Sequence, residues 1–528
     1  MLNSRALVFF INPPNSNDLG TLQADGKYVS KGVQHTDWAN FPHLGILSLA
    51  SYVDLIPGLE SIYIDGVIHD IDTIIGAVRE RADRTFAVCL SAITANYEAA
   101  IILARTIKTI DPAITIVMGN DHFSAMNQEI FAHHDWIDCG FIGNEIYTGL
   151  GDYLRDRQRG QTDGIYPGSI RQHCGRIIVD RQIREDINRI VDYRLIDRTL
   201  PHSAVYSTNF TRRLGNRIHQ LTGRRAQRGV PVEIGRGCIK FSGNDACSFC
   251  SIQYGEIWKN ELPAADAWRA IHQAWSAGYD YLYVTADELP LTFASLMLEM
   301  AASPPDWWKG LEADERPILV GYARTDGMER VQVLEAMRTI GFRILFVGVD
   351  AGVALSLQAL NKPLKSKCPE LAAKQMYEAN LRALENARKH QVSIKAGFVL
   401  GHLGMNESLL EENVQMYIEF LRSGKDVIIS ADIELLSPEP GSKDFNYLID
   451  PKSAEAFSER LGLPIAPYAL RSQVASKYRG IDAFDREGAI EDYVEVFMPT
   501  LSKSQLSGAR DRVRSECTQL GIVIGDDI

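Results

Sequence analysis

Short strand-like segments alternate with helix-like segments along the first 150 residues of the chain. Five segments that are apolar or β-branched are predicted to be strands, at residues 6–11, 61–64, 86–90, 114–118 and 136–141. The clearest helix is predicted at 97–110, because its apolar residues recur at helical spacing and Asp111-Pro112 stops the pattern. This alternation predicts a doubly wound, Rossmann-like α/β domain at residues 1–152, whose ligands bind beyond the carboxyl ends of parallel strands.

The predicted strand ends carry residues suited to a large ligand. Glycines and small hydroxyls at these ends let a cofactor lie close to the backbone. The residues concerned are Asn12, Pro13, Pro14, Ser91, Thr94, Gly119, Asn120, His122, Gly143 and Glu145. Taken singly, each is more often part of an ordinary turn, and His122 alone is more often a turn or capping histidine.

A second strand–helix series occupies residues 230–450. Strands are predicted at 232–234, 281–285, 318–322, 344–349, 394–400 and 427–436, and helices at 264–277 and 371–389. Six such strands predict a partial, TIM-like (β/α)6 barrel. The chemistry of such barrels lies at the carboxyl ends of the strands.

Two segments show no such alternation. Residues 153–229 are interpreted as a connector, and residues 451–528 as a small, mainly helical region that caps the barrel mouth or forms an oligomer contact. The connector contains a run of arginines, namely Arg212, Arg213, Arg217, Arg224, Arg225 and Arg228. A charge run is typical of a solvated face. The alternative is that some of these arginines meet phosphate groups or an acidic electron-donor protein.

Three cysteines follow the first strand of the second series. Cys238, Cys247 and Cys250 are separated by eight and by two residues. Three thiolates on one loop suit three irons of a [4Fe–4S] cube and leave the fourth iron open to a ligand. The alternatives are a zinc site short of one ligand and three unrelated cysteines. Residues 239–246 are expected to loop out into solvent, so that trimming them leaves the cluster intact.

The composition of the chain argues against some classes of binding partner. A net charge of −12 and a pI of about 5.6 argue against general affinity for nucleic acid or anionic membranes. No apolar run approaches the roughly 20 residues needed to span a bilayer. Eight cysteines in 528 residues do not indicate a disulfide framework, and we expect a cytoplasmic protein. The partner is expected to be a small molecule or a protein, and the substrate a small molecule or a peptide.

Ordered motifs connect these features to a known family. They begin with the turn Asn12-Pro13-Pro14, the stretch 42–50, the segment 112–122 and the turn 143–145. Arg236-Gly237-Cys238 and the cysteine pair at 247–250 follow, and the later segments are 286–290, 348–351, 357–362, 400–404 and 438–442. In order and spacing the chain resembles the radical S-adenosylmethionine (SAM) enzymes, within the class that has an N-terminal cobalamin-binding domain.

The chain departs from that family in three places. The gap between the first two cysteines is eight residues where the family has three, and Ala286-Asp287 replaces a Gly-Gly pair. Asn120 replaces the second glycine of another such pair. An Asp-x-His-x-x-Gly motif does not follow Asn12, so cobalt is expected to lack a lower axial histidine from this chain.

The resemblance implies a [4Fe–4S] cluster on the three cysteines, SAM, and cobalamin at the strand-end residues given above. SAM-binding residues are expected at Phe249, Tyr254, Asp287, Glu288, Arg324 and Asp350. Glu288 is expected to hold the SAM amine. Arg324 is expected to hold the SAM carboxylate, although an ion pair with Asp326 is an equal alternative. No catalytic side chain is assigned.

The activity implied by the resemblance is radical chemistry followed by transfer of a methyl group from methylcobalamin to a substrate carbon, in natural-product biosynthesis. A flavodoxin-type or ferredoxin-type protein would supply electrons. Two alternatives stay open. One is a cyclase or ring-rearranging enzyme with the same cofactors, and the other is a non-catalytic iron–sulfur binding or sensing protein.

Overall fold

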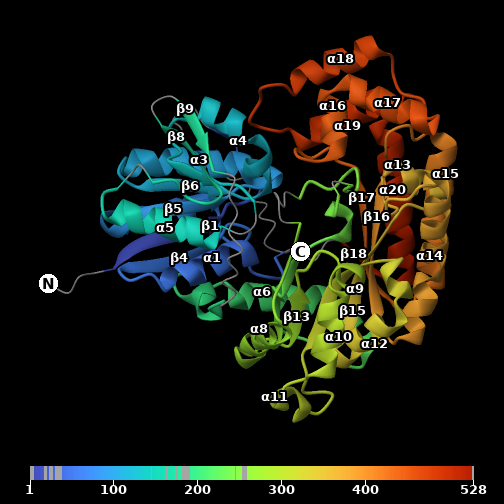
Figure 1. Ribbon diagram of the computed structural model, residues 1–528, viewed down its shortest axis with the longest axis horizontal. Helices are drawn as coiled ribbons and strands as arrows, with labels where there is room; N and C mark the ends of the chain where they lie inside the picture. The colour runs from blue at the N-terminus through green and yellow to red at the C-terminus, as the bar shows by residue number, and fades with distance from the viewer. Residues whose placement is uncertain are drawn as a thin grey trace.

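Figure 1 shows two sheet-containing parts that lie side by side, with helices of the C-terminal region above the second. The structure is a computed structural model that describes residues 5–16, 19, 21–22, 28–29, 39–143, 146–161, 164–173, 176–180, 191–243, 245–252 and 258–525. Among these residues, no helix is both long enough and apolar enough to cross a membrane.

The first part is built on a seven-stranded sheet of order β4-β1-β5-β6-β7-β8-β9. Its strands are β1 (Ala6–Asn12), β4 (Leu59–Asp65), β5 (Thr85–Ser91), β6 (Thr115–Gly119), β7 (Cys139–Phe141), β8 (Ser169–His173) and β9 (Arg176–Val179). The first five pair in parallel, and β8 and β9 join antiparallel. The chain order reverses direction between β1 and β5, and ligands of such sheets bind beside that switch point.

Helices surround this sheet, as predicted for a doubly wound domain (Figure 1). They are α1 (Leu44–Asp54), α2 (Ile71–Arg79), α3 (Tyr97–Ile110), α4 (Asp121–His133) and α5 (Tyr147–Gln158). Strand β1 is buried from Leu7 to Ile11, because a central parallel strand is covered on both faces. A separate two-stranded ladder joins β2 (Thr21–Leu22) to β3 (Tyr28–Val29).

The second part is a half-barrel of order β10-β13-β14-β15-β16-β17-β18, in which all pairs are parallel. Its strands are β10 (Gly229–Val232), β13 (Tyr281–Val284), β14 (Ile318–Arg324), β15 (Phe342–Asp350), β16 (Ser393–Leu400), β17 (Ile428–Leu435) and β18 (Val523–Ile524). The six predicted strands are present, although the first begins three residues earlier than predicted. The seventh comes from the C-terminal region, where only helices were predicted.

Helices cover the outside of the half-barrel (Figure 1). They are α8 (Ala264–Ser276), α9 (Leu289–Thr292), α10 (Ala294–Ala302), α11 (Asp306–Lys309), α12 (Val331–Ile340), α13 (Ala354–Ala359), α14 (Pro369–Lys389) and α15 (Glu407–Ser423). A short ladder of β11 (Gly235–Gly237) and β12 (Lys259–Glu261) lies beside the cysteine loop.

The connector packs into the half-barrel. Helices α6 (Ser203–Phe210) and α7 (Asn216–Thr222), with the π-helical turn Thr211–Gly215 between them, place Phe210, Leu214 and Ile218 in one core cluster with Tyr281 and other inward residues of the strands. Two arginines of the predicted solvated run reach backbone carbonyls instead. Arg217 donates to Lys425 and Ile428 at 2.7 and 2.8 Å, and Arg224 donates to Asp314 at 3.0 Å. Both therefore anchor the connector to the barrel.

The C-terminal region is mainly helical, as predicted. Its helices are α17 (Pro451–Leu461), α18 (Tyr468–Lys477), α19 (Arg486–Phe497) and α20 (Lys503–Leu520), and α16 (Lys443–Ile449), which directly precedes the region, packs against α17 and α18. Helix α20 lies along α15, and Arg422 pairs with Glu516 at 2.8 Å. The other four helices form a separate group above the barrel (Figure 1).

Candidate active site

The cysteine loop lies just after β10 and β11 in the half-barrel. Cys238, Cys247 and Cys250 are free thiols, and Cys247 is buried. Burial raises the pKa of Cys238 to about 12, and the charge of Cys247 adds to this effect. Burial also raises the pKa of Cys250, with Cys247 again the next cause. The Cys250 amide donates to the Cys247 carbonyl at 3.2 Å, so these two cysteines lie on one turn. The three-cysteine donor set fits a [4Fe–4S] cluster.

That arrangement differs from a site for a single ion. Among the described residues, no three His, Cys, Asp or Glu side chains gather closely enough to hold one metal ion. In a [4Fe–4S] cube each cysteine thiolate binds its own iron, so the thiols stand farther apart than the ligands of one ion.

Three buried cations lie near the cysteine loop, each paired with a carboxylate. Lys240 lies 3.3 Å from Asp245, and Arg324 lies 2.9 Å from Asp326. Lys362 pairs with Asp350. The charge of Cys247 acts to raise the pKa of all three cations. Arg324 in turn acts to lower the pKa of Cys238, so this cation opposes the effect of burial on that thiol.

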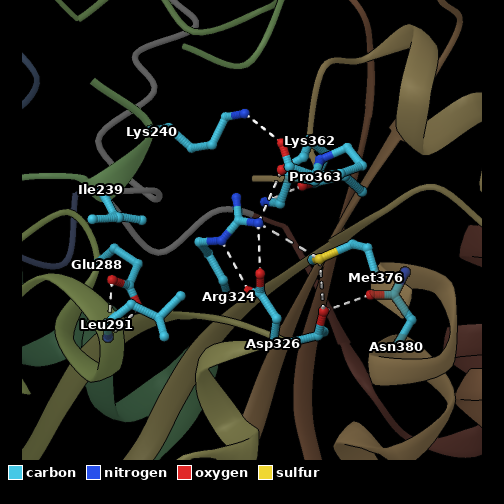
Figure 2. A network of polar contacts seen from close by, with 12 residues as sticks. Ile239, Lys240, Glu288, Leu291, Arg324, Asp326, Lys362, Pro363, Met376 and Asn380 are labelled. Carbon is cyan, nitrogen blue, oxygen red and sulfur yellow. Dashed lines mark hydrogen bonds and ion pairs between the residues drawn. The ribbon is translucent and has the colours of Figure 1, made fainter. Parts of the chain in front are cut away.

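The guanidinium of Arg324 uses two of its three nitrogens in hydrogen bonds to the described residues. Its Nε and Nη2 donate to the two carboxylate oxygens of Asp326, each at 2.9 Å, and Nη2 also donates to the carbonyl of Lys362 (Figure 2). Nη1 is buried and has no hydrogen-bond partner among the described residues. The ion pair with Asp326 is therefore present, and a donor remains for a further acceptor.

Glu288 and Asp287 both hold local structure. The buried Glu288 carboxylate caps α9, accepting from the Thr292 amide at 2.7 Å and from the Leu291 amide at 3.1 Å (Figure 2). Burial raises its pKa, although the hydrogen bonds from Thr292 and Leu291 oppose this effect. Asp287 accepts from the Gly237 amide at 2.9 Å, next to Cys238. Their contacts with SAM stay predictions.

The remaining predicted SAM-binding residues are Asp350, Phe249 and Tyr254. Asp350 ends β15 with φ of 59°, and its carboxylate faces Lys362. Burial acts to lower the pKa of Lys362, but Asp350 and Cys247 outweigh it and raise this pKa. Phe249 is partly buried against the main core. Tyr254 lies outside the described residues.

The prediction that residues 239–246 loop out into solvent is wrong for most of the segment. Lys240 is only 2% exposed, and its ammonium donates to the Pro363 carbonyl at 2.6 Å. Burial lowers the pKa of Lys240, against the opposing effects of Cys247 and Asp245. Only Ser242 and Gly243, at the tip of the segment, are exposed among its described residues.

The strand ends of the first part form the predicted cobalamin-binding edge. Asn12 is buried at the end of β1, where its amide donates to Asp65 at 3.0 Å and its carbonyl oxygen accepts from Asn96 at 3.1 Å. Pro13 and Pro14 are also buried. Asn12 thus shapes the turn, since these bonds occupy much of its side chain.

The next two strand ends are joined to each other. Asn120 follows β6 with φ of 84° and donates to Ser91, at the end of β5, at 2.8 Å. This positive φ explains why glycine suits the position. His122 lies 3.3 Å from the Thr94 hydroxyl, and Gly119 accepts a backbone bond from Ala92.

Gly143 lies beyond β7 with φ of 84°. Glu145 lies outside the described residues. The structure therefore brings the ends of β1, β5 and β6 together at one edge, and contact of these residues with cobalamin stays a prediction.

No sequence pattern predicted a contact between the first part of the chain and the C-terminal region. Asp482, in the loop between α18 and α19, accepts from the Tyr97 hydroxyl and from His134, each at 2.7 Å. Its backbone carbonyl lies 2.9 Å from Nε2 of His122. The C-terminal region therefore docks on the predicted cobalamin-binding edge.

Comparisons with known proteins agree with this architecture. The family model described as B12 binding domain matches residues 38–147. The solved structure of OxsB, a cobalamin-dependent S-adenosylmethionine radical enzyme with aqua-cobalamin and S-adenosylmethionine bound, is similar with a TM-score of 0.58 at 13% identity, over 90% of this chain and 66% of OxsB. This chain thus spans slightly less than two thirds of the length of OxsB. No curated protein sequence matches the chain.

TsrM from Kitasatospora setae, a radical S-adenosylmethionine methyltransferase with cobalamin and a [4Fe–4S] cluster bound, is similar with a TM-score of 0.59 at 15% identity. The match covers 85% of this chain and 78% of TsrM. The predicted fold class is confirmed by these likenesses. The chain therefore contains a B12-binding domain and has the fold of the cobalamin-dependent radical SAM enzymes.

Proposed function

We propose that this protein is a cobalamin-dependent radical SAM enzyme that methylates a carbon atom of a small-molecule or peptide substrate. The observation that carries the proposal is the set of three free, neighbouring thiols at the half-barrel, in a chain that also contains a B12-binding domain. Methyl transfer is the finer part of the proposal. It is supported by likeness to TsrM, which is described as a methyltransferase.

Cys238, Cys247 and Cys250 would hold the cluster. Nη1 of Arg324 is the donor best placed to bind the carboxylate of SAM, because it is buried and unpartnered among the described residues. The strand ends at Asn12, Ser91 and Asn120 would receive cobalamin. When bound, the cluster and SAM supply a carbon-centred radical, and cobalamin supplies the methyl group.

The chain's own residues would hold these groups together and keep water out. Lys240, Arg324 and Lys362 place positive charge around the thiolates. The Asp482 contact closes the two parts of the chain on each other at the strand-end edge. Close apposition matters, because a radical reacts with whatever lies nearest.

We also propose the wider setting. A flavodoxin-type or ferredoxin-type protein would deliver electrons, and the protein would be cytoplasmic. Residues 1–152, 230–450 and 451–528 would form the cobalamin-binding, barrel and C-terminal domains.

The test is anaerobic reconstitution with iron, sulfide and cobalamin, followed by absorption spectroscopy and incubation with methyl-labelled SAM and candidate substrates. Label in the product supports methyl transfer, whereas an unlabelled, rearranged product replaces it with the cyclase. Failure to take up cobalamin removes the methylation mechanism. Cys247→Ala should abolish SAM cleavage. Cys368→Ala is the matched control, since Cys368 is an exposed thiol and should be dispensable.

A further inference from the structure

The segment between Cys238 and Cys247 is tied to the barrel at its two ends. Near its start, Lys240 donates to the Pro363 carbonyl at 2.6 Å (Figure 2). Near its end, the Asn361 amide donates to the Asp245 carboxylate at 2.9 Å and to the Ala246 carbonyl at 2.7 Å. Both anchors fall on the same turn, residues 361–363, so the segment is an internal strut.

One ion pair joins the start of the strut to its end. Lys240 and Asp245 lie 3.3 Å apart, and the Lys240 side chain is 1% exposed. The turn that receives the strut also holds Arg324, which donates to the Lys362 carbonyl at 2.9 Å. The strut is thus continuous with the cation set around Cys247.

The buried charge lies close to the cysteines along the chain, because Lys240 is two residues after Cys238 and its partner Asp245 is two residues before Cys247. Cys247 and Asp245 both act to raise the pKa of Lys240, and Cys247 is the stronger of the two. Lys443 offers a comparison, because it lies 3.5 Å from the same carboxylate but its side chain is 30% exposed. Solvent screens an exposed charge far more than a buried one.

We propose that Lys240 is a positioning residue of the cluster site, which fixes the spacing of Cys238 from Cys247 and stabilises the reduced cluster by its buried charge. The inference rests on the proposed function, because it presumes a cluster on these cysteines. Reduction adds one electron from an external one-electron donor, such as dithionite in the test, and no covalent bond forms or breaks. The Lys240 ammonium would oppose the added negative charge, and net charge is one of the quantities that sets a cluster's potential.

The experiment compares the wild type with Lys240→Met, Lys240→Arg, Asp245→Asn and Lys443→Met after anaerobic reconstitution. Iron and sulfide per chain are measured, and the midpoint potential is obtained by redox titration with electron paramagnetic resonance, without SAM. Lys240→Met should bind the cluster about 10-fold or more weakly, as for other supporting residues of metal sites. Its remaining cluster should have a more negative midpoint potential, and Lys240→Arg should restore the wild-type value.

Asp245→Asn tests the direction of the shift in midpoint potential. Removing a negative charge should shift the midpoint potential in the positive direction, opposite to Lys240→Met. Lys443→Met is the matched control and should shift the potential least. A merely structural strut predicts lost iron in both strut variants without shifts of opposite sign.

Several outcomes overturn the inference. An unchanged potential in Lys240→Met does so, as do shifts of the same sign in Lys240→Met and Asp245→Asn. If circular dichroism shows that Lys240→Met does not fold, Asp245→Asn decides, and an unchanged or more negative potential refutes the inference. A wild-type protein that takes up no cluster refutes the proposed function itself.

Discussion

Replacing Asp482 by Ala should release the C-terminal loop from the first part of the chain. The Asp482 carboxylate is 18% exposed and accepts two hydrogen bonds of 2.7 Å, from Tyr97 and His134. Hydrogen bonds to charged groups contribute about 1.5–3 kcal/mol each when buried. Partial exposure favours the low end, so the pair contributes about 3 kcal/mol. Since 1.4 kcal/mol is about tenfold in an equilibrium constant, the open state should become about 100-fold more populated.

Hydrogen exchange measures this opening directly. Amides near Tyr97 and His122 should exchange faster in Asp482→Ala than in the wild type. Asp492→Ala is a matched control, because Asp492 accepts from Lys477 and Tyr478, which both belong to the C-terminal region. Equal exchange near Tyr97 in both variants would refute the docking role of Asp482.

The same contact predicts a dependence on pH. Burial acts to raise the pKa of Asp482, but the bonds from Tyr97 and His134 outweigh it and hold this pKa below its usual value. A carboxyl group with a lowered pKa stabilises the folded state above its unfolded pKa of about 3.9, and this contribution is lost as the pH falls further. The wild type should therefore open further below about pH 4, and Asp482→Ala should not show this added opening.

Three further substitutions test the fold and the strand-end edge. Gly66→Ala should lower the free energy of unfolding by about 3 kcal/mol in urea titrations and weaken cobalamin binding, because the new Cβ would lie 2.3 Å from the Pro14 nitrogen. Asn120→Ala should cost about 1–3 kcal/mol by thermal melting, since it keeps a positive φ and loses the bond to Ser91. Burial lowers the pKa of His402 to about 4, so the wild type should lose about 3 kcal/mol of stability as the pH falls from 6.5 to 4, and His402→Gln should not show this loss. Equal pH profiles of stability for the wild type and His402→Gln would contradict the lowered pKa of His402.

Local patterns predicted most of the regular structure. Helix α3 begins at Tyr97 and ends at Ile110, as its apolar spacing and the following Asp-Pro predict. The first barrel strand was misplaced, because pairing with β13 selects Gly229–Val232 from an apolar stretch that continues beyond it. Strand β18 is only two residues long, and its pairing with β17 alone makes it a strand.

The residues of the candidate site were likewise predicted only in part from the sequence. The trio Cys238, Cys247 and Cys250 is visible in the sequence, and the ordered motifs around it are what favour a cluster over a zinc site or unrelated cysteines. It does not indicate that Lys240 is buried, because the Pro363 carbonyl that accepts from it lies 123 residues farther along the chain. A charged residue in a short loop is usually solvated, which made the solvent-facing prediction reasonable and wrong.

By itself the sequence determined the alternation of strands and helices, the cysteine loop and the turns at the strand ends, because each depends on residues close together in the chain. The tertiary structure alone decided which carboxylate faces Lys240, which turn receives the strut and where Asp482 docks. Tyr97 and Asp482 are 385 residues apart, and hydrogen-bond partners at such separation leave no periodic pattern in a sequence. Packing brings them together, and the buried Tyr97 then needs a hydrogen-bond partner for its hydroxyl.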